Sequence, residues 1–322
     1  MNGSEIIDKI NRFGQEGIPF IFAVNFDGEE GFVLGMEEVG WNKILFDIGG
    51  RKNYIRDEAF ILERFVIRPV EFEDYLKAFK SVIYHIRRGD TYLLNLTFST
   101  PIETNLSLAG LFHVSRATYK LLVPGKFVVF SPEIFIRIRN NNIFSYPMKG
   151  TIDASEEDAA ARILNDRKEF YEHNTIVDLI RNDLAMVSTG VEVIRFRYIE
   201  EIHTNRKNLL QVSSEISGRL PGGWRKRLGE ILFRLLPAGS VTGAPKKRTV
   251  EIIKETELYD RGFYTGIFGH FDGEKLESAV SIRYIEQLGS DMVYKSGGGI
   301  TAMSDVRSEY EEMVQKVYVP LI

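Results

Sequence analysis

Two predicted helices each carry a pair of glutamates three residues apart, Glu169 with Glu172 and Glu309 with Glu312. A spacing of three puts both carboxylates of a pair on one helix face. If the two faces met across a cleft, they would offer hard oxygen ligands for Mg²⁺, which often takes only one or two carboxylates besides water and substrate oxygens. The same spacing also suits a solvated helix face, on which Lys316 would be an ordinary i, i+4 partner of Glu312.

A lysine and a further glutamate have the residue types needed for covalent and acid–base chemistry. Lys149 lies in the segment 146–151, where proline and glycine break a predicted strand end, and such loops often carry catalytic groups. A lysine whose amine is deprotonated can act as a nucleophile. Glu133 follows Ser131 and a proline, and a carboxyl in a partly apolar site has a raised pKa that suits a general acid. Taken singly, each could also be an ordinary surface charge.

Glycine-rich segments could bring backbone amides close to a small anion; they lie at 239–243, 266–273 and 297–299. The first continues to Lys246 but does not end in the Gly-Lys-Ser/Thr of a Walker phosphate loop. No dinucleotide fingerprint follows a strand with suitable spacing. Arg283 could hold a carboxylate with two parallel hydrogen bonds, or could form a strand-end salt bridge.

The composition excludes several other kinds of chemistry. The 322 residues include no cysteine, which rules out disulfides, cysteine-ligated metals and a cysteine nucleophile. Acidic residues outnumber basic ones by 45 to 41, so a general nucleic-acid-binding surface is not expected. No apolar run approaches the roughly 18 residues of a membrane span, and no apolar signal core follows Met1. We therefore expect no membrane association and a cytoplasmic location.

An alternation of strand-rich and helical segments must position these residues. Periodicity predicts helices at residues 71–88, 156–164, 168–185, 224–235, 247–256 and 305–318. It predicts strands at 19–26, 31–35, 91–97, 126–130, 134–138, 143–146, 191–202, 209–218, 264–271, 276–284 and 292–296. This order favours an α+β fold of mostly antiparallel sheets, with two layers facing a cleft. We expect one domain over residues 1–322, with a strand-rich part at 1–70 and a motif-bearing core at 71–322.

In their order along the chain, these segments resemble the chorismate-utilising enzymes. This family includes the anthranilate, aminodeoxychorismate, isochorismate and salicylate synthases. The resemblance covers roughly residues 70–320. It is carried by Ser131-Pro-Glu133, Pro147-Met-Lys-Gly-Thr151, the stretch from Glu172 to Asp183, Gly239-Ser-Val-Thr-Gly-Ala-Pro-Lys246, Arg261-Gly-Phe-Tyr-Thr-Gly266, Ser281-Ile-Arg283, and Gly297-Gly-Gly-Ile300 through Glu312.

The resemblance implies an α+β sandwich with outer helices and an active site between its two layers. Mg²⁺ there would bridge the ring carboxylate of chorismate, with Glu172 and Glu312 as direct ligands. Glu169 and Glu309 would act directly or through water. Glu133 would be the general acid that protonates the departing C4 hydroxyl.

The resemblance also implies a set of substrate-binding residues. These are Thr242, Tyr264, Arg283, Gly298, Gly299 and Lys316. Arg283 and Tyr264 would hold the enolpyruvyl carboxylate, helped by the glycine backbone amides. Lys316 would lie near the metal-bound carboxylate.

Lys149 distinguishes members of the family from one another. Pro-Met-Lys-Gly-Thr resembles the aminodeoxychorismate synthases, because anthranilate synthases and most isochorismate synthases have alanine in place of this lysine. A lysine that adds at C2 while hydroxide leaves C4, followed by ammonia attacking C4, divides one awkward substitution into two easier ones. The resemblance thus implies component I of an aminodeoxychorismate synthase, on the route to 4-aminobenzoate and folate. An anthranilate synthase component I and a catalytically silent chorismate-binding subunit are the alternatives.

Two positions depart from the family pattern, and the missing cysteine implies a partner. Leu93 stands where water-adding relatives have lysine and amine-using members usually have glutamine; leucine cannot activate water. Gln211 stands where many members have histidine. Without cysteine, the chain cannot be the Cys-His-Glu glutaminase that releases ammonia. We expect ammonia to come free from solution or from a separate glutamine amidotransferase subunit.

Overall fold

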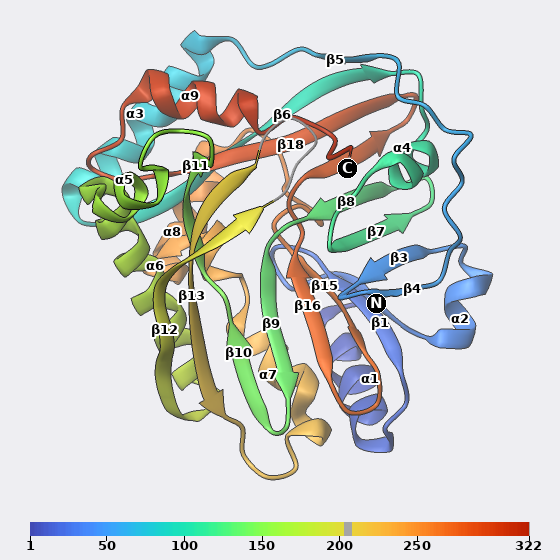
Figure 1. Ribbon diagram of the computed structural model, residues 1–322. Coiled ribbons are helices and arrows are strands. Elements are labelled where there is room, and N and C mark those ends of the chain that lie inside the picture. The colour runs from blue at the N-terminus through green and yellow to red at the C-terminus, as the bar shows by residue number, and fades with distance from the viewer. Residues whose placement is uncertain (203–207, 322) are drawn as a thin grey trace.

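Two antiparallel sheets of nine strands each form the centre of the molecule (Figure 1). The computed structural model describes residues 1–202 and 208–321. The first sheet has the order β11 (Met148–Asp153), β13 (Leu209–Arg219), β10 (Asn142–Ser145), β9 (Ile134–Arg139), β16 (Leu276–Val280), β15 (Ile267–Phe271), β1 (Phe20–Val24) and β2 (Gly31–Gly35), and β12 (Thr189–Ile202) pairs with β13. These sheets and their covering helices confirm the predicted α+β sandwich.

The second sheet contains the strands that frame the glycine-rich 297–299 segment. Its order is β14 (Gly243–Ala244), β6 (Leu93–Thr104), β18 (Asp291–Ile300), β17 (Tyr284–Leu288), β8 (Phe127–Ser131), β7 (Tyr119–Val123), β3 (Leu45–Ile48) and β4 (Arg51–Lys52), and β5 (Phe65–Ile67) pairs with β6. Residues 1–70 therefore contribute strands to both sheets.

The side chains of β1 point alternately to the two faces of the first sheet, which shows how this sheet is held against its helices and against the second sheet. Phe20, Phe22 and Val24 pack with the helices that cover the first sheet, whereas Ile21 and Ala23 pack toward the second sheet. All five side chains are buried, because a strand covered on both faces has no solvent side. The apolar interior between the sheets fixes their relative position.

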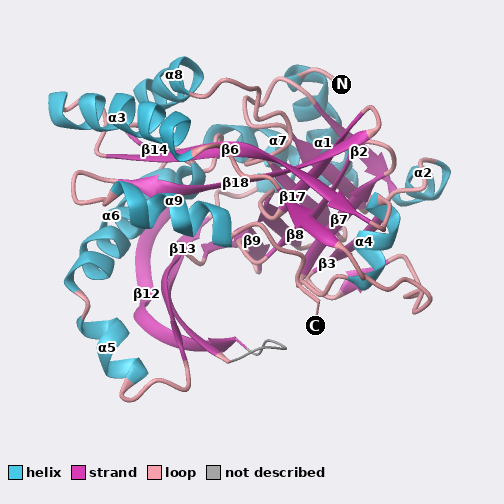
Figure 2. Cartoon of the chain, turned by 90° about the horizontal axis from the view of Figure 1, so that it is seen from above, coloured by secondary structure: helices cyan, strands magenta, loops and turns pink. Residues whose placement is uncertain are grey.

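Helices cover the outer faces of both sheets. They are α1 (Gly3–Glu16), α2 (Met36–Trp41), α3 (Phe72–Arg88), α4 (Leu108–Val114), α5 (Ala159–Asn165), α6 (Arg167–Ala185), α7 (Leu228–Leu235), α8 (Lys246–Thr256) and α9 (Val306–Gln315), with short 3₁₀ turns at Trp224–Arg227 and Gly239–Val241. Helices α3, α8 and α9 lie on the side of β6 and β18 (Figure 2). Tyr75, Phe79, Val82 and Ile86 recur at helical spacing on α3 and are buried there. Within the described residues, no helix is both long and apolar enough to cross a membrane.

The structure corrects two predictions about elements. Residues 276–284 do not form one strand, because β16 ends at Val280 in the first sheet and β17 begins at Tyr284 in the second. The chain changes sheets at residues 281–283, and Arg283 takes a φ of 55° there. The strand-rich reading of the N-terminal part missed α1, although Asn2 and Glu5 form a capping box at its start.

Candidate functional site

A pocket lies between the two sheets, with walls from β11 of the first sheet, β6 and β18 of the second, α6 and the end of α9. It contains about 770 Å³ of space, part of it open to solvent. The lining residues are Leu93, Asn95, Glu133, Met148, Lys149, Glu172, Ile176, Ser240, Val241, Tyr264, Ile282, Arg283, Gly297, Gly299 and Lys316. Seven of the twelve site residues expected from the sequence are in this set, so the fold brings distant motifs together.

Lys149 enters the pocket from an irregular part of β11. The register of β11 against β13 shifts between Met148 and Thr151, and Gly150 has a φ of 85°. Such a bulge takes a side chain out of the regular alternation of a strand. A Cβ at Gly150 would come within 3.1 Å of Oε2 of Glu169, so glycine also permits the close approach of α6.

Lys149 forms an ion pair with the second glutamate of α6. Its Nζ lies 2.8 Å from Oε2 of Glu172, whose side chain is 7% exposed. Burial by itself would lower the pKa of Lys149, but the Glu172 carboxylate, with Glu312 and Glu169 farther away, outweighs burial and raises that pKa. Lys149 is therefore a paired ammonium in the ligand-free chain.

Helix α9 brings the second glutamate pair beside the same pocket, next to Gly298. Glu309 is buried, and its Oε1 accepts a hydrogen bond of 2.7 Å from the hydroxyl of Ser304. Glu312 pairs at 2.7 Å with Lys316, one turn later, and Lys316 also donates to the carbonyl of Gly297 at 3.0 Å. Burial lowers the pKa of Lys316, and Glu312 offsets this only in part. The two helices thus present similar carboxylate–lysine pairs.

The carboxylates suit a hard divalent cation that takes few ligands from the protein. Within residues 1–202 and 208–321, no group of three or more His, Asp or Glu side chains could hold a metal alone. However, a Cβ at Gly298 would lie 3.6 Å from Oε2 of Glu309 and 3.8 Å from Oε1 of Glu312, so both carboxylates converge on one bare stretch of β18. Mg²⁺ usually keeps several waters and takes one or two carboxylates plus substrate oxygens. The carboxylates of Glu172 and Glu312 would suit Mg²⁺ if they separated from Lys149 and Lys316, with which they are paired.

Glu133 has the surroundings of a general acid. It lies between β8 and β9, where its backbone N–H donates to Oγ of Ser131 at 3.1 Å. Its Oε1 accepts a hydrogen bond from the hydroxyl of Ser240. Burial raises the pKa of Glu133, while Ser240, Arg283 and Lys316 lower it in part. A carboxyl with a raised pKa holds a proton that it can deliver to a leaving group.

Arg283 offers hydrogen-bond donors to the pocket at the point where the chain changes sheets. Its φ of 55° is rare for a residue with a side chain, and such strain is concentrated at functional sites. Within the described part of the chain, its Nε is buried and has no hydrogen-bond partner. Tyr264, which is 3% exposed, lines the same wall. A partly buried guanidinium whose Nε donor is open is suited to a carboxylate ligand.

The structure also brings Asn95 and Ser240 to the pocket, and neither was assigned a role from the sequence. Asn95 and Leu93 line the pocket from β6, while Leu94 and Leu96, between and beyond them, are buried under the helices. The two-residue period of a strand could have revealed Asn95 once Leu93 was placed. Ser240 was within a recognised motif but received no role.

Five of the twelve expected site residues lie outside the pocket lining, namely Thr242, Gly298, Glu169, Glu309 and Glu312, and so does Gln211. Thr242 is completely buried, and its hydroxyl donates to the carbonyl of Ala238 at 2.8 Å. Its proposed contact with substrate stays a prediction, and Ser240 and Val241 line the pocket from the same loop. Gln211 pairs with Thr151 of β11 and Glu200 of β12 in the sheet.

Two stacked antiparallel sheets that hold three cationic side chains and a partly buried acid between them suit a small acidic substrate. The family model of the chorismate binding enzymes matches residues 57–321. The chain belongs to this family.

Several relatives show which members are similar. An uncharacterized PabA-like protein of Haemophilus influenzae is 46% identical over 315 residues, covering 98% of this chain and 96% of its own. Aminodeoxychorismate synthase component 1 of Salmonella typhimurium is 30% identical over 260 residues, covering 76% of this chain and 56% of its own. The crystal structure of anthranilate synthase component I from Streptococcus pneumoniae superposes with a TM-score of 0.70 at 25% identity, covering 81% of this chain and 60% of that one.

Proposed function

We propose that the chain is component I of an aminodeoxychorismate synthase, converting chorismate and ammonia into 4-amino-4-deoxychorismate and water. The observation that carries this proposal is Lys149, which lines the pocket and lies on the same wall as Glu172. Of the activities weighed from the sequence, amination at C4 is the one that gives such a lysine a covalent role. The similarity to aminodeoxychorismate synthase component 1 of Salmonella typhimurium supports the proposal.

Charge in the pocket suits chorismate, which carries two carboxylates. Lys149, Lys316 and Arg283 supply three cationic side chains to one pocket, and Arg283 has an open donor. Arg283 would bind the enolpyruvyl carboxylate, and the ring carboxylate would lie toward the glutamates of α6 and α9. Bidentate binding by arginine would fix the ring orientation that the reaction needs.

The reaction is divided into two displacements. Lys149 first gives its ammonium proton to water, and its neutral amine then forms a bond to C2. The ring double bond shifts, and the C4–O bond breaks while Glu133 donates its proton, so that water leaves. Ammonia then forms a bond to C4, the double bond shifts back, and the C2–N bond to Lys149 breaks. The proton lost from the new ammonium group returns to Glu133. Each step has a positioned nucleophile and a leaving group.

Mg²⁺ and a nitrogen-donating partner complete the proposal. Glu172 and Glu312, with Glu169 and Glu309 directly or through water, would hold Mg²⁺, which would screen and orient the ring carboxylate. The chain has no cysteine, so it cannot itself use the cysteine chemistry of a glutaminase. Ammonia would come from solution or from a separate glutamine amidotransferase subunit, and the product would enter the synthesis of 4-aminobenzoate and folate.

One assay tests the proposal. The purified chain is incubated with chorismate, Mg²⁺ and an ammonium salt, and products are identified by mass and absorbance. We expect 4-amino-4-deoxychorismate with ammonium and no product with glutamine alone. Anthranilate together with pyruvate would instead indicate an anthranilate synthase. This is the second candidate function, because the similar Streptococcus pneumoniae structure is an anthranilate synthase component I. Absence of turnover by a folded chain would favour a silent chorismate-binding subunit.

A further inference from the structure

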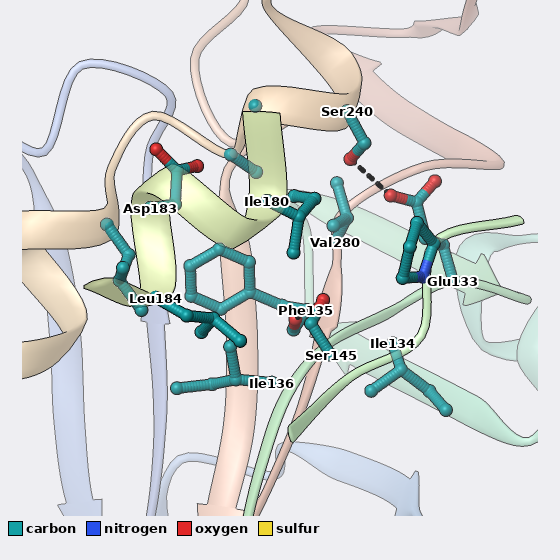
Figure 3. Close-up of a pocket in the computed structure, with 14 residues that line it drawn as sticks. Glu133, Ile134, Phe135, Ile136, Ser145, Ile180, Asp183, Leu184, Ser240 and Val280 are labelled. Carbon is teal, nitrogen blue, oxygen red and sulfur yellow. Dashed lines mark hydrogen bonds between the residues drawn. The ribbon is translucent and has the colours of Figure 1, made fainter. Parts of the chain in front are cut away.

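Glu133 stands between two cavities of different character. On one side lies the polar pocket with Lys149 and Arg283. On the other lies a cavity of about 390 Å³, part of it open to solvent, where Phe135, Ile180 and Val280 form much of the wall (Figure 3). Glu133 and Ser240 line both cavities. One face of the carboxyl therefore lines the polar pocket, and the other meets mainly apolar side chains.

The polar side chains of the apolar cavity have distinct partners. The hydroxyl of Ser145 donates to the carbonyl of Phe135 at 3.2 Å. Asp183 lies 2.7 Å from the ammonium of Lys246. The hydroxyl of Ser240 points at Glu133 and donates to its Oε1 (Figure 3). Ser240 is thus the side chain on this side that can set the orientation of the Glu133 carboxyl.

We propose that Ser240 is a positioning residue for Glu133: it holds Oε1 as the hydrogen-bond acceptor and leaves Oε2 to carry the transferable proton toward the substrate. An oxygen that accepts a hydrogen bond from a hydroxyl is the unprotonated oxygen of a neutral carboxyl. This inference rests on the proposed function only in taking Glu133 as the acid. It adds a residue that acts through Glu133.

The loop that carries Ser240 is held firmly enough for this task. The hydroxyl of Thr242 donates to the carbonyl of Ala238, which ties the two ends of the short 3₁₀ turn. The backbone N–H of Asn95 donates to the carbonyl of Thr242 at 3.0 Å. A Cβ at Gly239 would come 2.9 Å from Cδ2 of Leu179, so the loop is packed directly on α6. Preorganised support of this kind is what a proton donor requires.

The groups that face Glu133 determine the sign of the expected pH effect. Burial raises the pKa of Glu133, whereas the Ser240 hydroxyl and the charges of Arg283 and Lys316 favour the ionised form. Tyr264, also in this wall, has a pKa raised by burial, so it is neutral at ordinary pH. Removing the hydroxyl of Ser240 therefore raises the pKa of Glu133 further. The alkaline limb of the rate profile, where the acid loses its proton, should move to higher pH.

The test compares Ser240→Ala with Ser240→Thr and with Ser145→Ala, which removes a hydroxyl from the same cavity without touching Glu133. We expect Ser240→Ala to lower kcat for chorismate consumption by about 10-fold, less than the roughly 10²–10⁴ of a whole general acid, with KM changed by less than about twofold. The alkaline limb of its pH–rate profile should move to higher pH, and Ser240→Thr should restore both kcat and the original position of that limb. Ser145→Ala should behave as the unaltered chain.

Two outcomes would overturn the inference. Either Ser240→Ala matches Ser145→Ala in rate and pH profile, or its rate falls with no movement of the limb and no rescue by threonine. The product is identified in the same reactions, so formation of anthranilate would end the proposed function and leave the Ser240 comparison valid, since the C4 hydroxyl leaves in both reactions. If the chain shows no turnover, the titration of Glu133 is followed by infrared difference spectroscopy, assigned with Glu133→Gln. A midpoint that does not rise in Ser240→Ala would also disprove the positioning role.

Discussion

The ammonium of Lys149 lies 2.8 Å from Oε2 of Glu172, so the proposed nucleophile and a proposed metal ligand neutralise each other in the ligand-free chain. A buried carboxylate and a nearby lysine each reduce the cost of desolvating the other. Lys316 and Glu312 repeat the arrangement at 2.7 Å on α9. Each of the two lysines is thus paired with one of the proposed metal ligands.

Replacing Lys149 should abolish amination. Lys149→Ala removes the nucleophile, and we expect formation of 4-amino-4-deoxychorismate to fall by at least about 100-fold, the lower end of what a positioned catalytic group contributes. Lys149→Arg keeps the positive charge without a usable nucleophile and should be as inactive. When the unaltered chain is incubated with chorismate and no ammonia, intact-protein mass spectrometry should show a mass increase equal to one chorismate less one water. Full activity of Lys149→Arg would disprove the covalent step.

Neutralising a glutamate on α6 or α9 should lower the affinity of the chain for Mg²⁺. In Glu172→Gln and Glu312→Gln, we expect at least about a 10-fold weaker affinity for Mg²⁺, because a hard cation loses a charged oxygen ligand. Calorimetric titration with Mg²⁺ in the presence of chorismate measures this without turnover. Glu311→Gln makes the same charge change at an exposed position of α9 and is the matched control. Equal affinity in all three variants would rule out the metal assignment.

Arg283 should act mainly on substrate binding. Arg283→Lys retains the charge but loses the planar fork, so we expect KM for chorismate to rise by about 10- to 100-fold, as for a lost hydrogen bond between charged groups. The exposed Arg227→Lys serves as the control. Initial rates over a range of chorismate concentrations provide the measurement. An unchanged KM would mean that the open Nε donor does not face a carboxylate.

The buried pair of Asp183 and Lys246 should stabilise the junction of α6 and α8. Lys246→Met leaves the mostly buried Asp183 carboxylate without its cation at 2.7 Å, and we expect the free energy of unfolding to fall by about 3–5 kcal/mol. Adding Asp183→Leu should recover part of that loss, because no unpaired charge remains. Denaturant titration checks both, with the exposed Lys247→Met as a control expected to stay within about 0.5 kcal/mol. Additive losses in the double variant would contradict the pairing.

His270 should make the fold less stable at mildly acidic pH. Burial lowers its pKa from about 6.5 to about 4, and its ring stacks on Phe46 between the sheets. The unfolded chain binds the proton more readily, so this contribution to stability is complete above about pH 6.5 and is lost as the pH falls toward 4. His270→Phe should reduce the pH dependence in this window by up to about 1.4 kcal/mol per pH unit. Denaturation between pH 4.5 and 8 measures it, and an unchanged slope would refute the assignment.

The sequence by itself determined which residue types are available and which segments are helices or strands with long, regular periodicity. The helix predicted at 71–88 is α3, and that at 168–185 is α6, because an amphipathic face repeats over many residues. Glu133, Lys149 and the four glutamates could be selected because their motifs follow one another in a family-specific order. Within the N-terminal part, α1 was not predicted, because the strand-favouring runs at 19–26 and 31–35 dominate the local pattern, although a capping box begins the helix.

Only the tertiary structure decided how those residues meet. The pairing of Lys149 with Glu172 depends on a bulge in β11 and on the packing of α6 against it, which no spacing along the chain specifies. The hydrogen bond from Ser240 to Glu133 joins residues 107 positions apart. The break at 281–283 was hidden because both halves of the stretch favour strands, while the change of sheet is imposed by their different neighbours. The pattern of residues along a segment indicates whether that segment favours helix or strand. A site made from separate elements depends instead on how those elements pack together.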